Sequence, residues 1–218
     1  MERYDLTKES DRLALVERVF VYPPTPHKRK HGPRGYTTYE PYREWLRDEF
    51  SYRCVFSLVR ETWDAWSITF DIDHLEPRAI RPDLTCEYDN LVYAMHRLNQ
   101  VRGKRAIPDP CKIGMGNCLR VNTQGDRCGY VEVLNEIGEQ IEWVFGLNSD
   151  KAVACRVKWL SILRSLAITD EKLFRLMIGY PSDLKDLHKK RNHENTRKEG
   201  LKQSAHFLRD AGTLPEWY

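Results

Sequence analysis

The sequence lacks the features that mark a membrane protein, an exported protein or a disulfide scaffold. No uncharged hydrophobic run approaches the roughly eighteen residues that a membrane-spanning helix needs. The first eight residues, Met-Glu-Arg-Tyr-Asp-Leu-Thr-Lys, are charged where a signal peptide would be apolar. The six cysteines include no CxxC pair, and we expect them to be reduced and mostly buried. We therefore expect a cytoplasmic protein with no membrane partner.

A strong excess of one charge is also missing. Lys and Arg number 35 against 32 Asp and Glu, which gives a net charge of +3 over 218 residues. The total charge therefore neither indicates nor excludes a nucleic-acid partner, and the local distribution of charge has to decide. Hydrophobic residues make up 41% and charged residues 31%, a composition typical of a globular protein rather than a disordered one.

Shifts in composition divide the chain into three segments, 1–38, 39–110 and 111–218. The first contains a basic arm at 22–36, with four prolines, two glycines, four Lys or Arg and no acidic residue. In the middle segment, helical spacing of apolar residues predicts one helix before a stretch of short strands and loops. Its expected elements are a helix at 39–50, strands at 53–58, 67–74 and 91–95, and a helix at 96–102 that ends before Gly103.

The last segment predicts a hairpin followed by helices. Two apolar runs flank Asn-Glu-Ile-Gly-Glu, which resembles a hairpin connection. Broad apolar faces at helical spacing follow, and then a highly charged stretch that we expect to be helical. The expected strands are 130–134 and 140–145, and the expected helices are 152–168, 171–178 and part of 183–210. Together the three segments predict an α+β protein with a mostly helical C-terminal half.

Polar side chains concentrate in the middle segment in an arrangement that apolar packing does not require. Asp73 and His74 end the strand at 67–74, Asn90 follows His74 by sixteen residues, and Asn99 follows nine residues later. Carboxylate and amide oxygens are hard ligands of the kind that Mg²⁺ or Mn²⁺ prefers. A histidine, with an ordinary pKa of about 6.5, can accept a proton near pH 7. This combination predicts metal-assisted hydrolysis.

The order and spacing of these residues resemble the HNH endonuclease family. The likeness spans about residues 52–105 and includes Asp-Asn-Leu before an apolar strand and Asn-x-x-x-Gly-Lys-Arg after it. It implies a ββα-metal nuclease core, and an enzyme that hydrolyses phosphodiester bonds of nucleic acid, DNA in preference to RNA, with water as the nucleophile.

The resemblance also implies a role for each residue. Asp73 and Asn99 would hold one Mg²⁺ or Mn²⁺ ion, and His74 would deprotonate the attacking water. Asn90 would serve the catalytic site by holding the loop between the two strands through backbone hydrogen bonds. Asp71 is either a further ligand, an outer partner of the site or a solvated carboxylate, and His96, one helical turn before Asn99, ranks below it as a ligand.

One departure from the family concerns zinc. Many members carry two CxxC pairs that bind a structural zinc ion, and the corresponding positions here are Cys54, Ser57, Met95 and Leu98. Methionine and leucine cannot supply thiolates, so we expect apolar contacts in place of a structural zinc. The spacing of Cys111, Cys118 and Cys128 matches no common zinc motif either.

Basic residues near the motif are candidates for contact with phosphate, because phosphate contacts supply most non-specific affinity for nucleic acid. We expect the same of the basic runs 28–30 and 189–191, although each of them can equally be an ordinary solvated surface. The candidates near the motif are Arg78, Arg81, Arg97, Arg102, Lys104 and Arg105.

Two other functions remain open at this point. The first is a catalytically inactive nuclease-like module that binds nucleic acid or a protein partner. The second, which the sequence favours less, is a metallohydrolase that acts on a small phosphoester, since no glycine-rich phosphate-binding loop is present.

Overall fold

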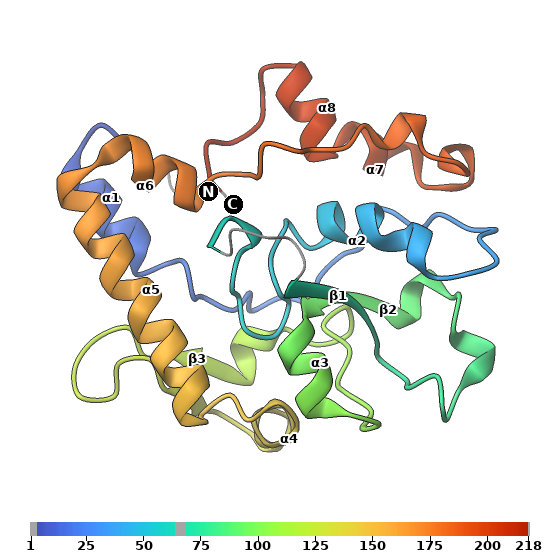
Figure 1. Ribbon diagram of the computed structural model, residues 1–218, viewed down its shortest axis with the longest axis horizontal. Coiled ribbons are helices and arrows are strands. Elements are labelled where there is room, and N and C mark those ends of the chain that lie inside the picture. The colour runs from blue at the N-terminus through green and yellow to red at the C-terminus, as the bar shows by residue number, and fades with distance from the viewer. Residues whose placement is uncertain (1–3, 64–68, 218) are drawn as a thin grey trace.

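Helices surround two small antiparallel sheets in this protein (Figure 1). The computed structural model describes residues 4–63 and 69–217. The helices are α1 (Glu9–Val16), α2 (Arg43–Glu49), α3 (His96–Arg102), α4 (Glu136–Phe145), α5 (Asp150–Thr169), α6 (Glu171–Ile178), α7 (Lys198–Lys202) and α8 (Ala205–Asp210). The strands are β1 (Phe70–His74), β2 (Leu91–Met95), β3 (Leu119–Val121) and β4 (Val131–Val133). This mixture is the expected α+β class.

The strand, loop, strand and helix order expected around the motif is present. Strand β1 pairs antiparallel with β2, with His74 opposite Leu91 and Asp73 opposite Val92, and α3 follows β2 directly. Burial explains the pairing, because the first four residues of β2 are buried against the core. The strand expected at 67–74 begins at Phe70 in the described part, and residues 67 and 68 lie outside it.

The strand expected at 53–58 is wrong. This segment forms a tight turn in which the Cys54 amide donates to the Val59 carbonyl and the Leu58 amide donates to the Cys54 carbonyl. Leu58 takes a positive φ of 61°, which a strand does not allow. The apolar residues face inward because the turn is packed into the core. Their run in the sequence therefore resembles that of a buried strand, which explains the wrong prediction.

The hairpin expected at 130–134 and 140–145 is half wrong. Strand β4 exists, but its partner is β3 rather than the second run, which forms helix α4. Asn135 caps this helix by accepting a hydrogen bond from the Gly138 amide at 3.0 Å. A Cβ at Gly138 would lie 2.2 Å from the Cys118 carbonyl oxygen, so this glycine permits close packing of α4 on the segment before β3.

The C-terminal region is helical up to residue 178 and irregular beyond it. Helices α5 and α6 confirm the helices expected at 152–168 and 171–178. The stretch 183–210 contains only the short helices α7 and α8 and two single turns. Asn192, with a positive φ of 64°, interrupts any longer helix there.

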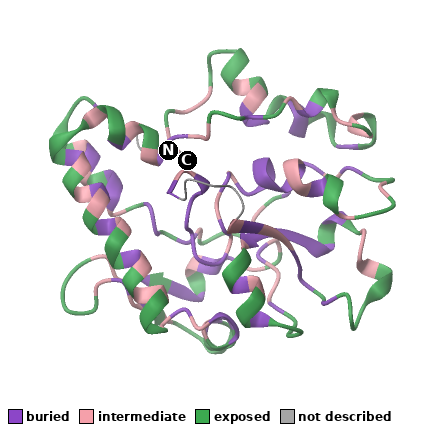
Figure 2. Ribbon diagram, in the orientation of Figure 1, coloured by how far each residue is buried: buried purple, intermediate pink, exposed green. Residues whose placement is uncertain are grey.

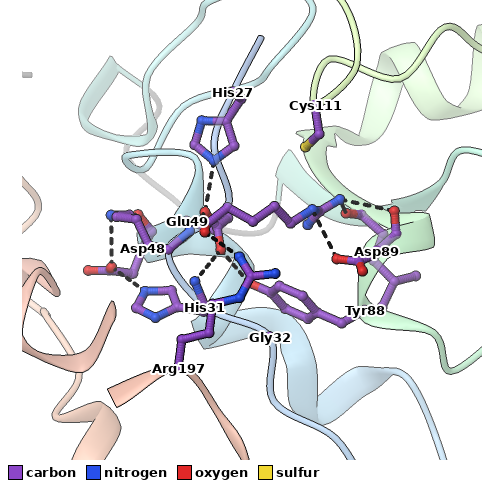
Figure 3. Close-up of polar contacts among 12 residues, drawn as sticks. His27, His31, Gly32, Asp48, Glu49, Tyr88, Asp89, Cys111 and Arg197 are labelled. Carbon is purple, nitrogen blue, oxygen red and sulfur yellow. Dashed lines mark hydrogen bonds and ion pairs between the residues drawn. The ribbon is translucent and has the colours of Figure 1, made fainter. Parts of the chain in front are cut away.

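The basic arm is not a free arm, because it packs against α2 (Figure 3). His31 is fully buried and lies 2.7 Å from Asp48, and the Lys30 ammonium lies 3.1 Å from the same carboxylate. Arg29 is also buried and donates to the Leu91 carbonyl at 2.8 Å. Of the run 28–30, which we expect to contact phosphate, Arg29 is buried and Lys30 is half-buried in these contacts, and Lys28 alone is exposed.

A continuous hydrophobic core joins the three segments of the sequence (Figure 2). It includes Leu15 from the first segment, Tyr93 from the middle one and Leu160 from the last, all with 1% exposure or less. The β1 and β2 pair lies near the centre of the molecule, between α2 and α3 (Figure 1). Within the described residues, no helix is both long enough and apolar enough to cross a membrane.

Candidate catalytic cleft at the end of strand β1

A cleft of about 890 Å³ opens at the end of β1. It brings together Asp73, His74 and Asn99 from the sequence motif, together with Asp71. Strict alternation along a strand would send Asp73 and His74 to opposite faces. They share the cleft because β1 ends at His74 and the chain turns away there, so the cleft wraps around the strand end.

The Asp73 carboxylate is buried, and its two oxygens have different surroundings. Oδ1 accepts hydrogen bonds from the His74 amide at 2.8 Å and from the Arg102 guanidinium. Oδ2 is buried and has no hydrogen-bond partner among residues 4–63 and 69–217. Burial raises the pKa of Asp73 to about 6, although the charge of Arg102 acts in the opposite direction. A buried carboxylate oxygen without a partner is costly, and a cation would satisfy it.

The His74 imidazole is held by a backbone carbonyl. Its Nε2 lies 3.1 Å from the Thr85 carbonyl oxygen, which can only accept, so Nε2 carries the proton. Burial lowers the pKa of His74 below its ordinary value, and the charges of Arg78 and Arg102 act in the same direction against the Thr85 bond. The neutral ring therefore presents Nδ1 as a proton acceptor, which is the state that a general base requires.

Asn90 lies outside the cleft and holds the loop that carries Thr85. Its Oδ1 accepts from the Glu76 amide at 2.8 Å, and its Nδ2 donates to the carbonyls of Glu76 at 3.1 Å and Leu84 at 3.2 Å. Because Leu84 is adjacent to Thr85, these bonds fix the carbonyl that orients His74. Asn90 therefore holds the loop through backbone groups, as expected, and does not line the cleft itself.

Asn99 and its neighbours form a polar cluster on the cleft side of α3. The Asn99 amide Nδ2 lies 3.5 Å from Asp71 Oδ2, and His96 Nδ1 hydrogen-bonds to the same oxygen. Gln100 in turn contacts His96 Nε2 at 2.7 Å. Since Nδ2 of Asn99 is turned toward Asp71, the Asn99 oxygen is left to face another partner.

The six basic candidates do not share one surface. Arg78 and Lys104 line the cleft and are exposed. Arg102 also lines it but is 2% exposed, and its guanidinium is taken by Asp73 and by the carbonyls of His74, Leu75 and Arg105. The remaining three, Arg81, Arg97 and Arg105, lie outside the cleft lining.

Three cleft residues were missed in the sequence. Tyr39 lies edge-on to the His74 ring at a centroid distance of 4.9 Å, and the Arg78 guanidinium lies 4.9 Å from the Tyr39 centroid. Glu40, in the helical turn before α2, and Arg43, the first residue of α2, also line the cleft. All three precede Asp73 by at least thirty residues, and no local pattern connects them with the motif.

The positions that hold zinc in many HNH enzymes are occupied by packed side chains. Cys54 is fully buried, Leu98 is buried and Met95 packs against the same core. Ser57 Oγ lies 3.2 Å from the Met95 sulfur. Among residues 4–63 and 69–217, no group of three or more His, Cys, Asp or Glu side chains is arranged to hold a metal.

The cleft nevertheless fits a hard divalent cation of the Mg²⁺ type. Mg²⁺ keeps several water ligands and takes only one or two carboxylates from a protein, so three protein carboxylates are not required. The unpartnered Oδ2 of Asp73 is the first observation in favour, and the Asn99 side chain in the same cleft is the second. Together with His74, these residues could activate a water molecule beside a bound anion.

Comparisons of the chain with protein-family models, with curated proteins and with solved structures returned no match.

Proposed function

We propose that this protein is a metal-dependent endonuclease that hydrolyses phosphodiester bonds of nucleic acid, with DNA as the preferred substrate. The proposal rests chiefly on the state of His74. Its Nε2 is held by the Thr85 carbonyl. Among the described residues, its Nδ1 has no hydrogen-bond partner, and neither does the buried Oδ2 of the adjacent Asp73 carboxylate.

Each residue of the cleft has a defined task in this reaction. His74 takes the proton of the attacking water through Nδ1, and the Thr85 carbonyl stabilises the imidazolium that forms. Asp73 and Asn99 would hold Mg²⁺ or Mn²⁺, which supplies stabilisation of negative charge on the scissile phosphate and the leaving oxygen. Arg78 and Lys104 bind the phosphates on either side, because they are the exposed cations of the cleft lining.

One observation favours a second candidate, an inactive module that binds nucleic acid or a protein partner. The Arg102 guanidinium already compensates the charge of Asp73, so the cleft is electrically satisfied to a degree that a metal site normally is not. The two candidates differ in whether the protein cleaves nucleic acid or only binds its partner.

The experiment that separates them is incubation of the purified protein with plasmid, linear duplex, single-stranded DNA and RNA, each with Mg²⁺, Mn²⁺ or EDTA. We expect cleavage with either metal and none with EDTA. His74→Ala should lower the cleavage rate by about 10²–10⁴-fold, the usual contribution of a positioned general base, while binding is retained. His188→Ala, at an exposed histidine outside the cleft lining, is the matched control and should cut normally.

Metal dependence provides a further check within the same experiment. Asp73→Ala and Asn99→Ala should lose activity that excess Mn²⁺ restores in part, whereas His74→Ala should not be rescued. If wild type and His74→Ala cut equally well, the assigned site is wrong. If neither cuts any substrate and both bind DNA, the binding module is the correct function.

A further inference from the structure

A second cavity lies on the other side of α3 from the catalytic cleft. Its volume is about 280 Å³, close to the lower end of the ~300–1,000 Å³ range of small-molecule pockets. Most of its wall is apolar and includes Met95, Leu98, Val101, Phe145 and Leu147. Leu98 and Val101 point to this cavity from α3, while Asn99 and Arg102 of the same helix line the cleft. The two sites therefore do not share side chains.

Two cations that have no partner among the described residues line this apolar cavity. Arg97 and Lys151 both line it and are both exposed. Within the described part of the chain, neither side chain forms an ion pair or hydrogen bond, and no carboxylate belongs to the lining. A third arginine, Arg156, is buried and is already used, since it donates to the carbonyls of Gly129 and Leu147.

We propose that this cavity binds a small amphipathic carboxylate, with an aliphatic tail inside and the carboxylate between Arg97 and Lys151. Charge complementarity selects the head group, because the two charged side chains of the lining that have no partner among the described residues, Arg97 and Lys151, are both cationic. The volume selects the tail: at roughly 30 Å³ for a group the size of water or methylene, the cavity holds about eight to ten carbons.

The same features argue against other occupants. A nucleic-acid strand carries no flexible apolar group of this size, and its phosphates would gain nothing from the apolar wall. A cationic or neutral amphiphile would place no negative charge beside Arg97 and Lys151. A medium-chain fatty carboxylate can contact the apolar wall with its chain and pair with Arg97 and Lys151 through its carboxylate.

Calorimetric titration of the full chain with hexanoate, octanoate and decanoate tests the proposal. Each added methylene that enters the cavity should tighten binding about fourfold. Decanol and decyltrimethylammonium are the matched ligands without the negative charge, and both should bind at least about tenfold more weakly than decanoate. The double variant Arg97→Gln/Lys151→Gln should weaken decanoate binding by a similar factor. Lys158→Gln, at an exposed lysine of α5 outside the cavity, should leave it unchanged.

A second variant keeps the test independent of the charges. Val101 is 47% exposed, so Val101→Trp has room to fold and should fill the mouth of the cavity and abolish decanoate binding, with an unchanged circular dichroism spectrum. No binding of decanoate to wild type overturns the proposal. Equal binding of decyltrimethylammonium, or unchanged affinity in the double variant, overturns it as well. None of these outcomes depends on nuclease activity, so the proposed function stands or falls separately.

Discussion

At the scale of single residues, Arg102 is the side chain that shapes the cleft. Its guanidinium joins Asp73 to the backbone at the end of β1 and to the segment after α3. By taking Oδ1 of Asp73, it leaves Oδ2 for another partner. Asp73 and Arg102 are both at most 3% exposed as side chains, so neither charge is compensated by water. Loss of either one leaves the other buried alone.

Replacement of Arg102 should therefore lower the stability of the fold, whatever its effect on binding of nucleic acid. We expect Arg102→Gln to lower the free energy of unfolding by about 3–5 kcal/mol, the usual cost of breaking a buried ion pair on one side. Urea denaturation followed by circular dichroism measures this. The control is Arg81→Gln, because Arg81 pairs with Asp83 at the exposed surface and should cost less than about 1 kcal/mol. Equal stability of the two variants would show that the buried pair of Arg102 and Asp73 contributes no more than an exposed pair does.

At the scale of elements, the sequence predicted best where periodicity and burial agree. Helices α5 and α6 and strand β2 were foreseen because their apolar spacing reflects contact with the core. Helix α4 was mistaken for a strand because Asn135 and Gly138 are typical of turns, whereas here one caps the helix and the other admits the Cys118 carbonyl. Tertiary contacts of this kind leave no local signal.

In the candidate site too, residues that are close in the sequence were predicted, and residues brought in by tertiary contacts were not. Asp73, His74 and Asn99 lie within thirty residues of one another, and their spacing placed them together. Tyr39 and Arg43 reach the cleft only through the packing of α2 on the sheet, which no short pattern encodes. The sequence makes Arg102 a candidate for phosphate contact and gives no sign of its ion pair with Asp73, because the two residues lie 29 positions apart.

The basic arm is attached to α2 mainly by hydrogen bonds and ion pairs with two carboxylates. The carboxylates of Asp48 and Glu49, at the end of α2, are buried among groups from the arm. Burial alone would raise both pKa values, but hydrogen bonds from His31 and His27 and the nearby positive charges outweigh it and lower each to about 2. The ordinary values are 3.8 and 4.5.

The sign of these shifts makes the arm sensitive to acid. A carboxyl with a depressed folded-state pKa stabilises the fold above its unfolded value and loses that contribution as the pH falls toward the folded value. We expect wild type to lose roughly 2–3 kcal/mol of unfolding free energy per carboxyl between pH 4.5 and 2.

Variants make this measurable. Asp48→Asn should be less stable than wild type by about 2–4 kcal/mol at pH 7, and the difference should shrink at pH 3 in urea denaturation. The matched change Glu199→Gln, at an exposed carboxyl of α7, should have little effect at either pH. A gap between Asp48→Asn and wild type that persists unchanged at pH 2 would show that the carboxylate is not the stabilising form.

At the scale of the whole molecule, positive and negative charges nearly cancel, so the position of individual cations matters more than their total number. A net charge of +3 provides little long-range attraction for a polyanion. Some of the cations are also paired inside the fold, including Arg47 and Arg102, whose partners Glu61 and Asp73 are buried. Arg29 is buried as well, although its partner Asp89 is exposed. Under the proposed function, the cations of the cleft lining that are exposed, Arg78 and Lys104, are the ones that would contact phosphate.

This leads to a prediction about salt. Each Lys or Arg that neutralises a phosphate of duplex DNA contributes about 0.9 to the slope of log K against log salt. Arg78→Gln/Lys104→Gln removes two cleft cations and should reduce that slope by about 1.8, measured by fluorescence anisotropy with a labelled duplex at several salt concentrations. Lys28→Gln/Arg81→Gln removes the same charge from exposed residues outside the cleft and should leave the slope nearly unchanged. The comparison holds net charge constant between the two variants, so a difference between them reports position alone. Equal salt slopes for the two double variants would show that the nucleic acid does not bind in the cleft.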